Sequence, residues 1–141
     1  MVGFTIYGNP KSKKNSQKII YRYTAAGMKK IPCIVQSDAY QAYAKDVTAQ
    51  LKEKGIWGLG INEPVNVRCR FYREDRRRCD LTNLLAAIDD IMVDAQILYD
   101  DNWNIIVSHD GSRVFYDKEN PRTEIMITRE GEEPLNDDYI Q

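Results

Sequence analysis

Polar side chains recur at helical spacing in one short segment of the chain. They stand three or four residues apart, at Asp80, Asn83, Asp90 and Asp94, and Ala87 completes the series. Residues at this spacing share one face of a helix. The segment therefore predicts three carboxylates and one amide along one side of a helix. The pair Asp100–Asp101 follows in a turn that would fold back toward that side.

An oxygen-rich cluster of this kind suits a divalent cation. Mg²⁺ binds through one or two carboxylates together with waters and substrate phosphates, and it activates a water and polarises a phosphodiester. Without a cation, neighbouring carboxylates repel one another by about 1 to 4 kcal/mol at 4 Å. The run Arg76, Arg77, Arg78 precedes the first carboxylate and would hold phosphates beside the metal. These residues predict metal-dependent cleavage of a phosphodiester.

A purely structural interpretation of the same residues is also open. Asp80 stands where a helix would begin and is a favourable N-cap residue. Asp89, Asp90 and Asp94 would then lie on a solvated helix face. Residues 100–102 would form an ordinary turn, because Asp and Asn favour turns. Spacing alone does not decide between the two interpretations.

Hydrophobic periodicity predicts the elements that must position these residues. Apolar residues alternate from Val65 to Phe71, as in a half-buried strand. Ala39, Tyr43, Val47 and Leu51 recur at helical spacing after Ser37, a plausible N-cap. We expect strands at residues 2–7, 19–23, 31–35, 65–72, 103–107 and 122–129, helices at 37–54 and 81–93, and a hairpin turn at Gly111–Ser112. This order predicts an α+β fold in which two main helices cover a mixed β-sheet.

Composition predicts one globular domain over residues 1–129 and an acidic tail over residues 130–141. The chain has 141 residues, of which 43% are hydrophobic and 29% are charged, as in ordinary globular domains. It has no apolar run of membrane-spanning length and no signal-peptide pattern. Cys33, Cys69 and Cys79 lack metal-binding spacing and indicate free thiols, so we expect a cytoplasmic protein.

The net charge of −1 conceals a basic N-terminal segment. Residues 1–37 contain seven basic residues and no acidic one, whereas the rest of the chain has 13 basic and 21 acidic residues. This excess predicts contact with a polyanion, and a solvated lysine-rich loop is the alternative. Tyr21 and Tyr23 flank Arg22 there, where they would pack within strands or stack on unpaired bases. The single histidine, His109, has no evident Asp or Ser partner, and we expect it to be structural.

Two motifs resemble those of a known family. The stretch Asp80-Leu81-Thr82-Asn83-Leu84-Leu85-Ala86-Ala87 is followed by Asp90 and by the pair Asp100–Asp101. It resembles the Asp-x-Asp-Asn-Leu-x-Lys-Ala motif, with later aspartates, of the RusA-type Holliday-junction resolvases, many of which are prophage-borne. Gly8-Asn9-Pro10-Lys11-Ser12-Lys13 also resembles the Gly-x-Pro-x-x-Lys opening of that family. The likeness spans about residues 3 to 129.

The resemblance implies a RusA-like fold and a Mg²⁺ site, with Mn²⁺ as the alternative metal. The catalytic metal ligands carried over from the family are Asp80, Thr82 and Asp101. Asp90 and Asn83 would lie in or beside the same site. Thr82 stands where the family has an aspartate, and Ala86 where it has a lysine. Lys13, Lys14 or Arg113 would be the substitutes for that lysine.

The resemblance also implies the partners. Family members are homodimers, and a two-fold dimer suits a four-way junction that needs two matched nicks in DNA recombination and repair. The implied DNA-binding residues are Lys11, Lys13, Lys14, Lys18, Arg76, Arg77 and Arg78. Two alternatives remain open. One is a junction-binding protein whose catalysis Thr82 and Ala86 weaken, and the other is a protein-interaction module whose acidic face contacts a basic partner.

Overall fold

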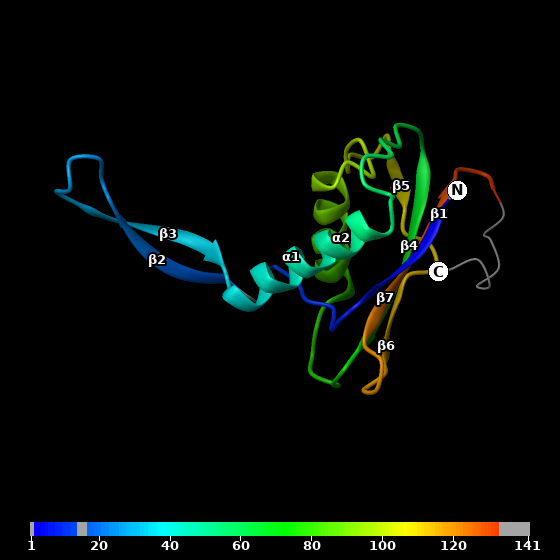
Figure 1. Cartoon of the computed structure of the whole chain (residues 1–141), viewed down its shortest axis with the longest axis horizontal. Coiled ribbons are helices and arrows are strands. Elements are labelled where there is room, and N and C mark those ends of the chain that lie inside the picture. Colours follow the sequence, from blue (N-terminus) through cyan, green and yellow to red (C-terminus); the bar gives the residue numbers. More distant parts are fainter. Residues whose placement is uncertain (1, 14–16, 133–141) are drawn as a thin grey trace.

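The structure is a computed structural model that describes residues 2–13 and 17–132. Its two helices are α1 (Asp38–Glu53) and α2 (Leu81–Asp94). Its strands are β1 (Val2–Tyr7), β2 (Gln17–Tyr23), β3 (Lys30–Gln36), β4 (Val65–Arg73), β5 (Ile106–Ser108), β6 (Arg113–Tyr116) and β7 (Arg122–Arg129). Figure 1 shows both helices on one side of a sheet and a long hairpin that projects away from it. The predicted α+β class is confirmed.

The main sheet is mixed. Strand β7 lies between β1 and β4 and is antiparallel to both. On its other edge β4 pairs in parallel with the short strands β5 and β6. After β4 a largely exposed charged loop, residues 74–80, leads into α2, and Arg73 at the end of β4 lines the same cavity as Leu84 in the first turn of α2. The N-terminal end of α2 is thereby fixed beside the end of a buried strand.

The core includes the alternating apolar side chains of β4 and the apolar side chains on one face of each helix. Val65, Val67, Cys69 and Phe71 are fully buried beneath the helices, as the alternating pattern predicts. Helix α2 buries Leu84, Leu85, Ile88, Ile91 and Met92 against them. Burying one such aliphatic side chain contributes about 1.5–3 kcal/mol to the free energy of folding. This packing makes α2 a rigid support for its polar residues.

Helix α1 starts where the sequence predicts and faces the core through a different residue. Ser37 is the N-cap, and its hydroxyl accepts a hydrogen bond from the Tyr40 backbone N–H at 3.1 Å. The buried positions are Tyr40, Tyr43, Val47 and Leu51, whereas Ala39 is exposed. A strict four-residue step drifts around a helix of 3.6 residues per turn, and this drift makes Tyr40 the inward residue.

The region after residue 103 differs most from the expected elements. The strand predicted at 103–107 is β5, and β6 was not predicted at all. The hairpin turn expected at Gly111–Ser112 is wrong, because β5 and β6 both run parallel to β4. The intervening loop bonds to β4 instead, and the Ser112 hydroxyl accepts from the Cys69 backbone N–H at 3.0 Å. Gly111 has a φ of +83° and packs on the Arg68 side chain, where a Cβ would come within 2.9 Å.

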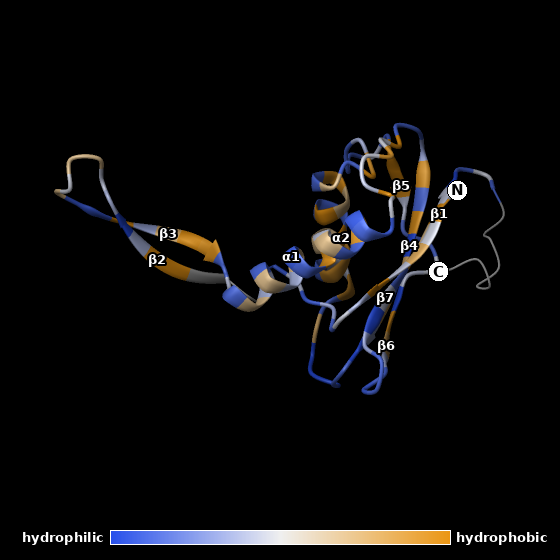
Figure 2. Ribbon diagram, viewed as in Figure 1, coloured by the Kyte–Doolittle hydropathy of each residue, from blue (hydrophilic) through white to orange (hydrophobic). Residues whose placement is uncertain are grey.

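Strands β2 and β3, with their connecting turn, form a separate two-stranded sheet that we call the β2–β3 arm (residues 17–36). The arm was predicted as a hairpin, with strands slightly shorter than those observed. It projects from the rest of the molecule (Figure 1), and apolar residues line it far from the core (Figure 2). Neither helix of the described chain is long and apolar enough to span a membrane. All three cysteines are free thiols, as predicted.

Candidate active site

The Asp90 carboxylate is the meeting point of three separate chain segments. It lies on α2, and the Lys13 ammonium, from the loop after β1, is 2.7 Å from its Oδ2. Asp101, from the turn after α2, also lies close to Asp90. The sequence predicted Asp90 and Asp101 in one site and named Lys13 as a substitute cation. The structure brings these three residues together.

A tight turn holds Asp101 in place. The Asp100 carboxylate accepts hydrogen bonds from the Asp101 backbone N–H at 2.7 Å and from the Asn102 amide at 3.0 Å. These bonds, the backbone one foremost, lower the pKa of Asp100. Partial burial and then the neighbouring carboxyl groups of Asp100 and Asp90 raise the pKa of Asp101. The turn therefore presents Asp101 as a carboxylate crowded by like charges.

Tyr40 also belongs to this cluster, although no sequence motif marks it. Its ring is buried, and its hydroxyl has no hydrogen-bond partner among the described residues. Burial, and then the charges of Asp90 and Asp94, raise the pKa of Tyr40 to about 12. A buried, unpaired hydroxyl is unusual in folded proteins. The 3.6-residue helical step from Tyr43 was the available signal for its inward position.

Asp80 and Asn83 form a second polar group at the other end of α2. Asp80 is the N-cap residue, but its side chain makes no capping bond. The Asn83 amide instead donates to its Oδ2 at 3.2 Å. Asp80 and Asp90 are ten residues apart, so a rise of 1.5 Å per residue separates them by about 15 Å along the axis. Thr82 and Ala86 are exposed on this helix.

The carboxylate oxygens of this cluster are of the type that Mg²⁺ prefers, but they are few. Among the described residues, no three His, Cys, Asp or Glu side chains are grouped closely enough to hold a metal ion. Mg²⁺, however, commonly uses one or two carboxylates and completes its shell with water and substrate phosphate. Asp90 and Asp101 provide such a pair. Burial first, and then the neighbouring carboxyl groups of Asp100 and Asp90, raise the pKa of Asp101, and a bound cation would offset the repulsion between the carboxylates.

Two predicted DNA-binding segments line one cavity next to Asp80. The cavity has a volume of about 290 Å³, and Lys11, Arg77 and Arg78 are among its lining residues. Asn9 ties the two loops together, because its side-chain oxygen accepts from the Glu74 backbone N–H at 3.0 Å. All three cations are thus displayed beside the N-terminal end of α2, where backbone N–H groups also favour an anion.

The other predicted DNA-binding residues are placed as follows. Arg76 stacks on the Tyr116 ring, with its guanidinium carbon 4.3 Å from the centroid. Lys14 lies outside the described residues, and only the backbone of Lys18, in β2, is described. Arg113, a predicted substitute for the missing motif lysine, lies on β6 over the Phe115 ring instead.

His109 has a carboxylate partner that the sequence did not reveal. Its Nε2 lies 2.9 Å from Oδ2 of Asp89, and its Nδ1 lies 2.8 Å from the Val67 carbonyl oxygen. The purely structural interpretation placed Asp89 on a solvated face, but Asp89 is buried. Burial alone would lower the pKa of His109, yet the bonds to Asp89 and Val67 raise it. Because both ring nitrogens face acceptors, the imidazolium is the form that this site favours, and its role is to join α2 to the sheet.

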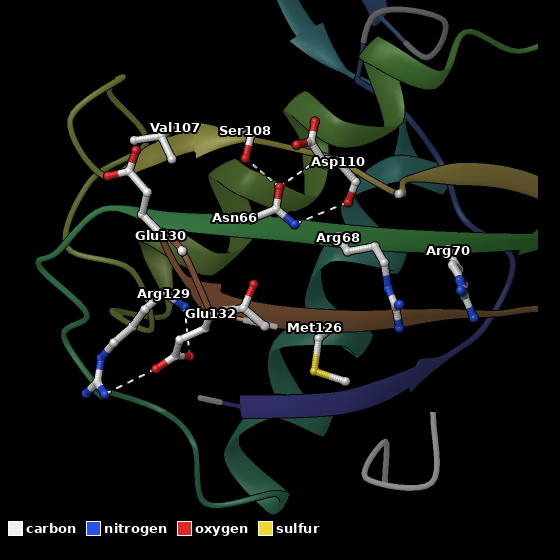
Figure 3. Close-up of a pocket in the computed structure, with 13 residues that line it drawn as sticks. Asn66, Arg68, Arg70, Val107, Ser108, Asp110, Met126, Arg129, Glu130 and Glu132 are labelled. Carbon is white, nitrogen blue, oxygen red and sulfur yellow. Dashed lines mark hydrogen bonds and ion pairs between the residues drawn. The ribbon is translucent and has the colours of Figure 1, made fainter. Parts of the chain in front are cut away.

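A larger cavity, of about 570 Å³, lies on the face of the sheet away from the helices. Figure 3 shows Arg68 and Arg70 of β4 beside Met126 of β7, with Asp110, Glu130 and Glu132 around them. Arg129, one of its lining residues, is paired with Glu63 and Glu132. None of the predicted site residues lines this cavity, and its lining mixes both signs of charge.

The family model described as Endodeoxyribonuclease RusA matches residues 8–128. The matched region includes Lys13, the Asp80 motif, Asp90 and Asp101. A search of curated proteins finds no match. Because the family match covers most of the 141 residues, the chain belongs to the RusA endodeoxyribonuclease family.

Proposed function

We propose that this protein is a Mg²⁺-dependent endonuclease that resolves four-way DNA junctions by paired nicks during recombination and repair. The observation that carries the proposal is the Asp90–Asp101 carboxylate pair with Lys13 against it, in a chain of an endodeoxyribonuclease family. A homodimer would present two such sites related by two-fold symmetry. Two matched sites fit a junction, which is itself close to two-fold symmetric.

Each residue of the candidate site would have a separate role in phosphodiester hydrolysis. Bound at Asp101, Mg²⁺ or Mn²⁺ would supply an activated water and polarise the scissile phosphate. Asp90, beside Asp101, would be the second carboxylate. Asp80 and Thr82, the other predicted ligands, start the same helix about 15 Å away along its axis and would act on the DNA there rather than on this cation. Lys13 would move from Asp90 to the phosphate and balance the charge that builds there. Asn83 would keep Asp80 oriented through the bond at 3.2 Å.

The basic loops would position the DNA. Lys11, Arg77 and Arg78 surround a cavity beside Asp80, and each phosphate that such a cation neutralises adds about 0.9 to the salt slope of binding. In the sequence, Lys14 and Lys18 extend the run of basic residues as far as β2. Phosphate contacts of this kind fix the register of the duplex and leave the choice of substrate to other contacts.

A weakened catalyst is the second candidate. Thr82 replaces an aspartate of the family motif, Ala86 replaces its lysine, and both residues are exposed on α2. The charge missing at these two positions would reduce the cleavage rate and leave DNA binding intact.

Cleavage of a synthetic junction tests the proposal. A labelled four-way junction and a linear duplex of the same sequence would be incubated with the protein in Mg²⁺ or EDTA. We expect paired nicks in the junction alone, absent in EDTA and reduced at least about 100-fold by Asp101→Asn. Glu63→Gln, in an exposed ion pair outside the site, is the matched control and should cleave normally.

Two further variants identify the second ligand. If Asp90 shares the cation with Asp101, Asp90→Asn abolishes nicking and Asp80→Asn weakens it less. The reverse order would assign the role to Asp80. A tight junction complex without nicks would support the weakened catalyst, and nicking that survives Asp101→Asn would contradict the proposed site.

A further inference from the structure

The β2–β3 arm exposes a large apolar and aromatic face to solvent. Tyr21 pairs with Pro32, and Ile19 pairs with Ile34. Directly paired residues share a face, as do residues two apart in a strand. Ile19, Tyr21, Tyr23 and Ile34 therefore form one surface, on which they are 63%, 64%, 65% and 71% exposed. Met28 in the connecting turn is 85% exposed.

This surface needs a partner. A lone two-stranded hairpin is marginally stable in water, and exposed apolar patches commonly mark interaction sites. Within the described chain, the strands of the arm pair only with each other. The arm is therefore built to be covered by something outside the folded domain.

Charge favours a polyanion as that partner. The arm contains Lys18, Arg22, Lys29 and Lys30 and no acidic residue. The Lys30 ammonium lies 5.7 Å from the Tyr23 ring centroid, so cation and aromatic ring occupy the same patch. A second arm of the same charge would repel this one. Cations interleaved with aromatic rings suit a nucleic acid, which offers phosphates and bases together.

Both ends of the arm are anchored at the candidate active site. Strand β2 begins four residues after Lys13, which binds Asp90. Strand β3 leads into α1, whose Tyr40 faces the same Asp90. Seven residues at about 3.3 Å each give the arm a reach of about 23 Å. DNA held at Asp90 and Asp101 would therefore pass within reach of Tyr21 and Tyr23.

We propose that the β2–β3 arm selects branched over linear DNA, with Tyr21 and Tyr23 stacking on bases exposed at the branch point. The inference rests on the proposed function and names the element that gives it substrate preference. In a continuous duplex each base is covered by its neighbours, so the rings find a stacking partner only where helices meet or end. Arg22, Lys29 and Lys30 bind the adjoining phosphates of any DNA, whether branched or linear.

Binding measurements on matched DNAs test this division of roles. Fluorescence anisotropy in EDTA would give the dissociation constants for a four-way junction and for a duplex of the same sequence. The Tyr21→Ala/Tyr23→Ala variant should lose at least about 25-fold in junction affinity, from at least about 5-fold for each stacked ring. Its duplex affinity should change by less than about 3-fold. Tyr21→Phe/Tyr23→Phe keeps both rings and should bind the junction as the wild type does.

A charge variant and a direct probe complete the test. Lys29→Ala/Lys30→Ala should weaken junction and duplex binding equally and reduce the salt slope by up to about 1.8. The wild type should change the fluorescence of 2-aminopurine placed at the branch point and leave the same base unchanged when it lies within a duplex arm. This probe needs no variant and reports stacking directly.

Several results would overturn the inference. If the alanine variant loses the same affinity for junction and duplex, or loses none, the rings do not select the branch point. If the alanine variant loses junction affinity and light scattering shows that it is a monomer where the wild type is a dimer, the arm binds a second copy of the chain instead. If the wild type binds and cleaves junctions selectively and the alanine variant does so equally well, the role proposed for the arm is refuted and the proposed function stands. A wild type without junction preference would refute the proposed function as well.

Discussion

The Lys13 ammonium lies 2.7 Å from the Asp90 carboxylate and joins the loop after β1 to the helix that carries the candidate site. Both side chains are partly exposed, and ion pairs of that kind contribute only about 0–1 kcal/mol to stability. The contact therefore matters mainly because it places a cation beside the carboxylates of Asp90 and Asp101.

Removing Lys13 should separate activity from stability. Lys13→Ala is expected to reduce the nicking rate at least 10-fold, because its charge would no longer balance that of the scissile phosphate, and to reduce unfolding free energy by less than about 1 kcal/mol. Junction cleavage and urea unfolding measure the two effects. Arg129→Ala breaks another exposed pair, with Glu63, and serves as the control that should cleave normally. A large loss of stability with unchanged cleavage would show that Lys13 is only structural.

Divalent metal should stabilise the folded protein. Mg²⁺ at about ten times its dissociation constant adds about 1.4 kcal/mol to the unfolding free energy, which raises Tm by roughly 3–6 °C for a domain of this size. The shift should vanish in Asp101→Asn. That variant should also have a higher Tm than the wild type without metal, because it removes a carboxylate repelled by Asp90 and Asp100. Differential scanning fluorimetry with Mg²⁺ or EDTA measures both, and an equal shift in the variant would contradict the site.

The His109–Asp89 pair predicts a pH dependence of stability. Since the pKa of His109 is raised in the folded protein, the folded state binds more protons than the unfolded chain just above the ordinary histidine pKa of about 6.5. The stabilisation that the protonated His109 gives the folded state is complete below that value. It is lost as pH rises through the pKa of His109 in the folded protein. Urea unfolding from pH 5.5 to 9 should show this decline in the wild type.

His109→Gln is the control for that measurement. Glutamine cannot titrate, so its stability profile should be flatter over the same range. An identical decline in wild type and variant would assign the pH dependence to another group.

The unpaired Tyr40 hydroxyl predicts an unusual stability change. A buried hydroxyl without a partner costs about 1–3 kcal/mol, so Tyr40→Phe should leave the unfolding free energy unchanged or raise it by up to about 1 kcal/mol. Val47→Ala, in the same helix and fully buried, should lower it through the cavity left behind. Chemical unfolding of the two variants makes the comparison. A destabilised Tyr40→Phe would mean that the hydroxyl binds a group in the site.

Much of the fold was predictable because burial leaves a periodic trace. The alternation from Val65 to Phe71 indicated β4, and Ser37 marked the start of α1. Strand β6 escaped notice because it has four residues at a sheet edge and is only partly buried. Periodicity also says nothing of parallel pairing, which is why the Gly111–Ser112 turn was misassigned.

The candidate site was predictable in its residue types and less so in its contacts. Asp90 and Asp101 stand in a recognisable motif, but the contact between Asp90 and Lys13 joins residues 77 positions apart. The same limit concealed the contact between Asp89 and His109. The sequence also predicted the two strands of the β2–β3 arm as a hairpin, but it did not reveal that both project away from the core, because a residue pattern does not record what covers a face.

Cleavage of a supercoiled plasmid that extrudes a cruciform tests the central claim most directly. The cruciform is a four-way junction, and it collapses once a single nick relaxes the plasmid. Paired nicks made in one encounter therefore yield linear DNA directly, whereas independent nicks yield open circles. The account predicts linear plasmid in Mg²⁺, none in EDTA and none with Asp101→Asn. Open circles alone, or linear product that persists in the variant, would contradict it.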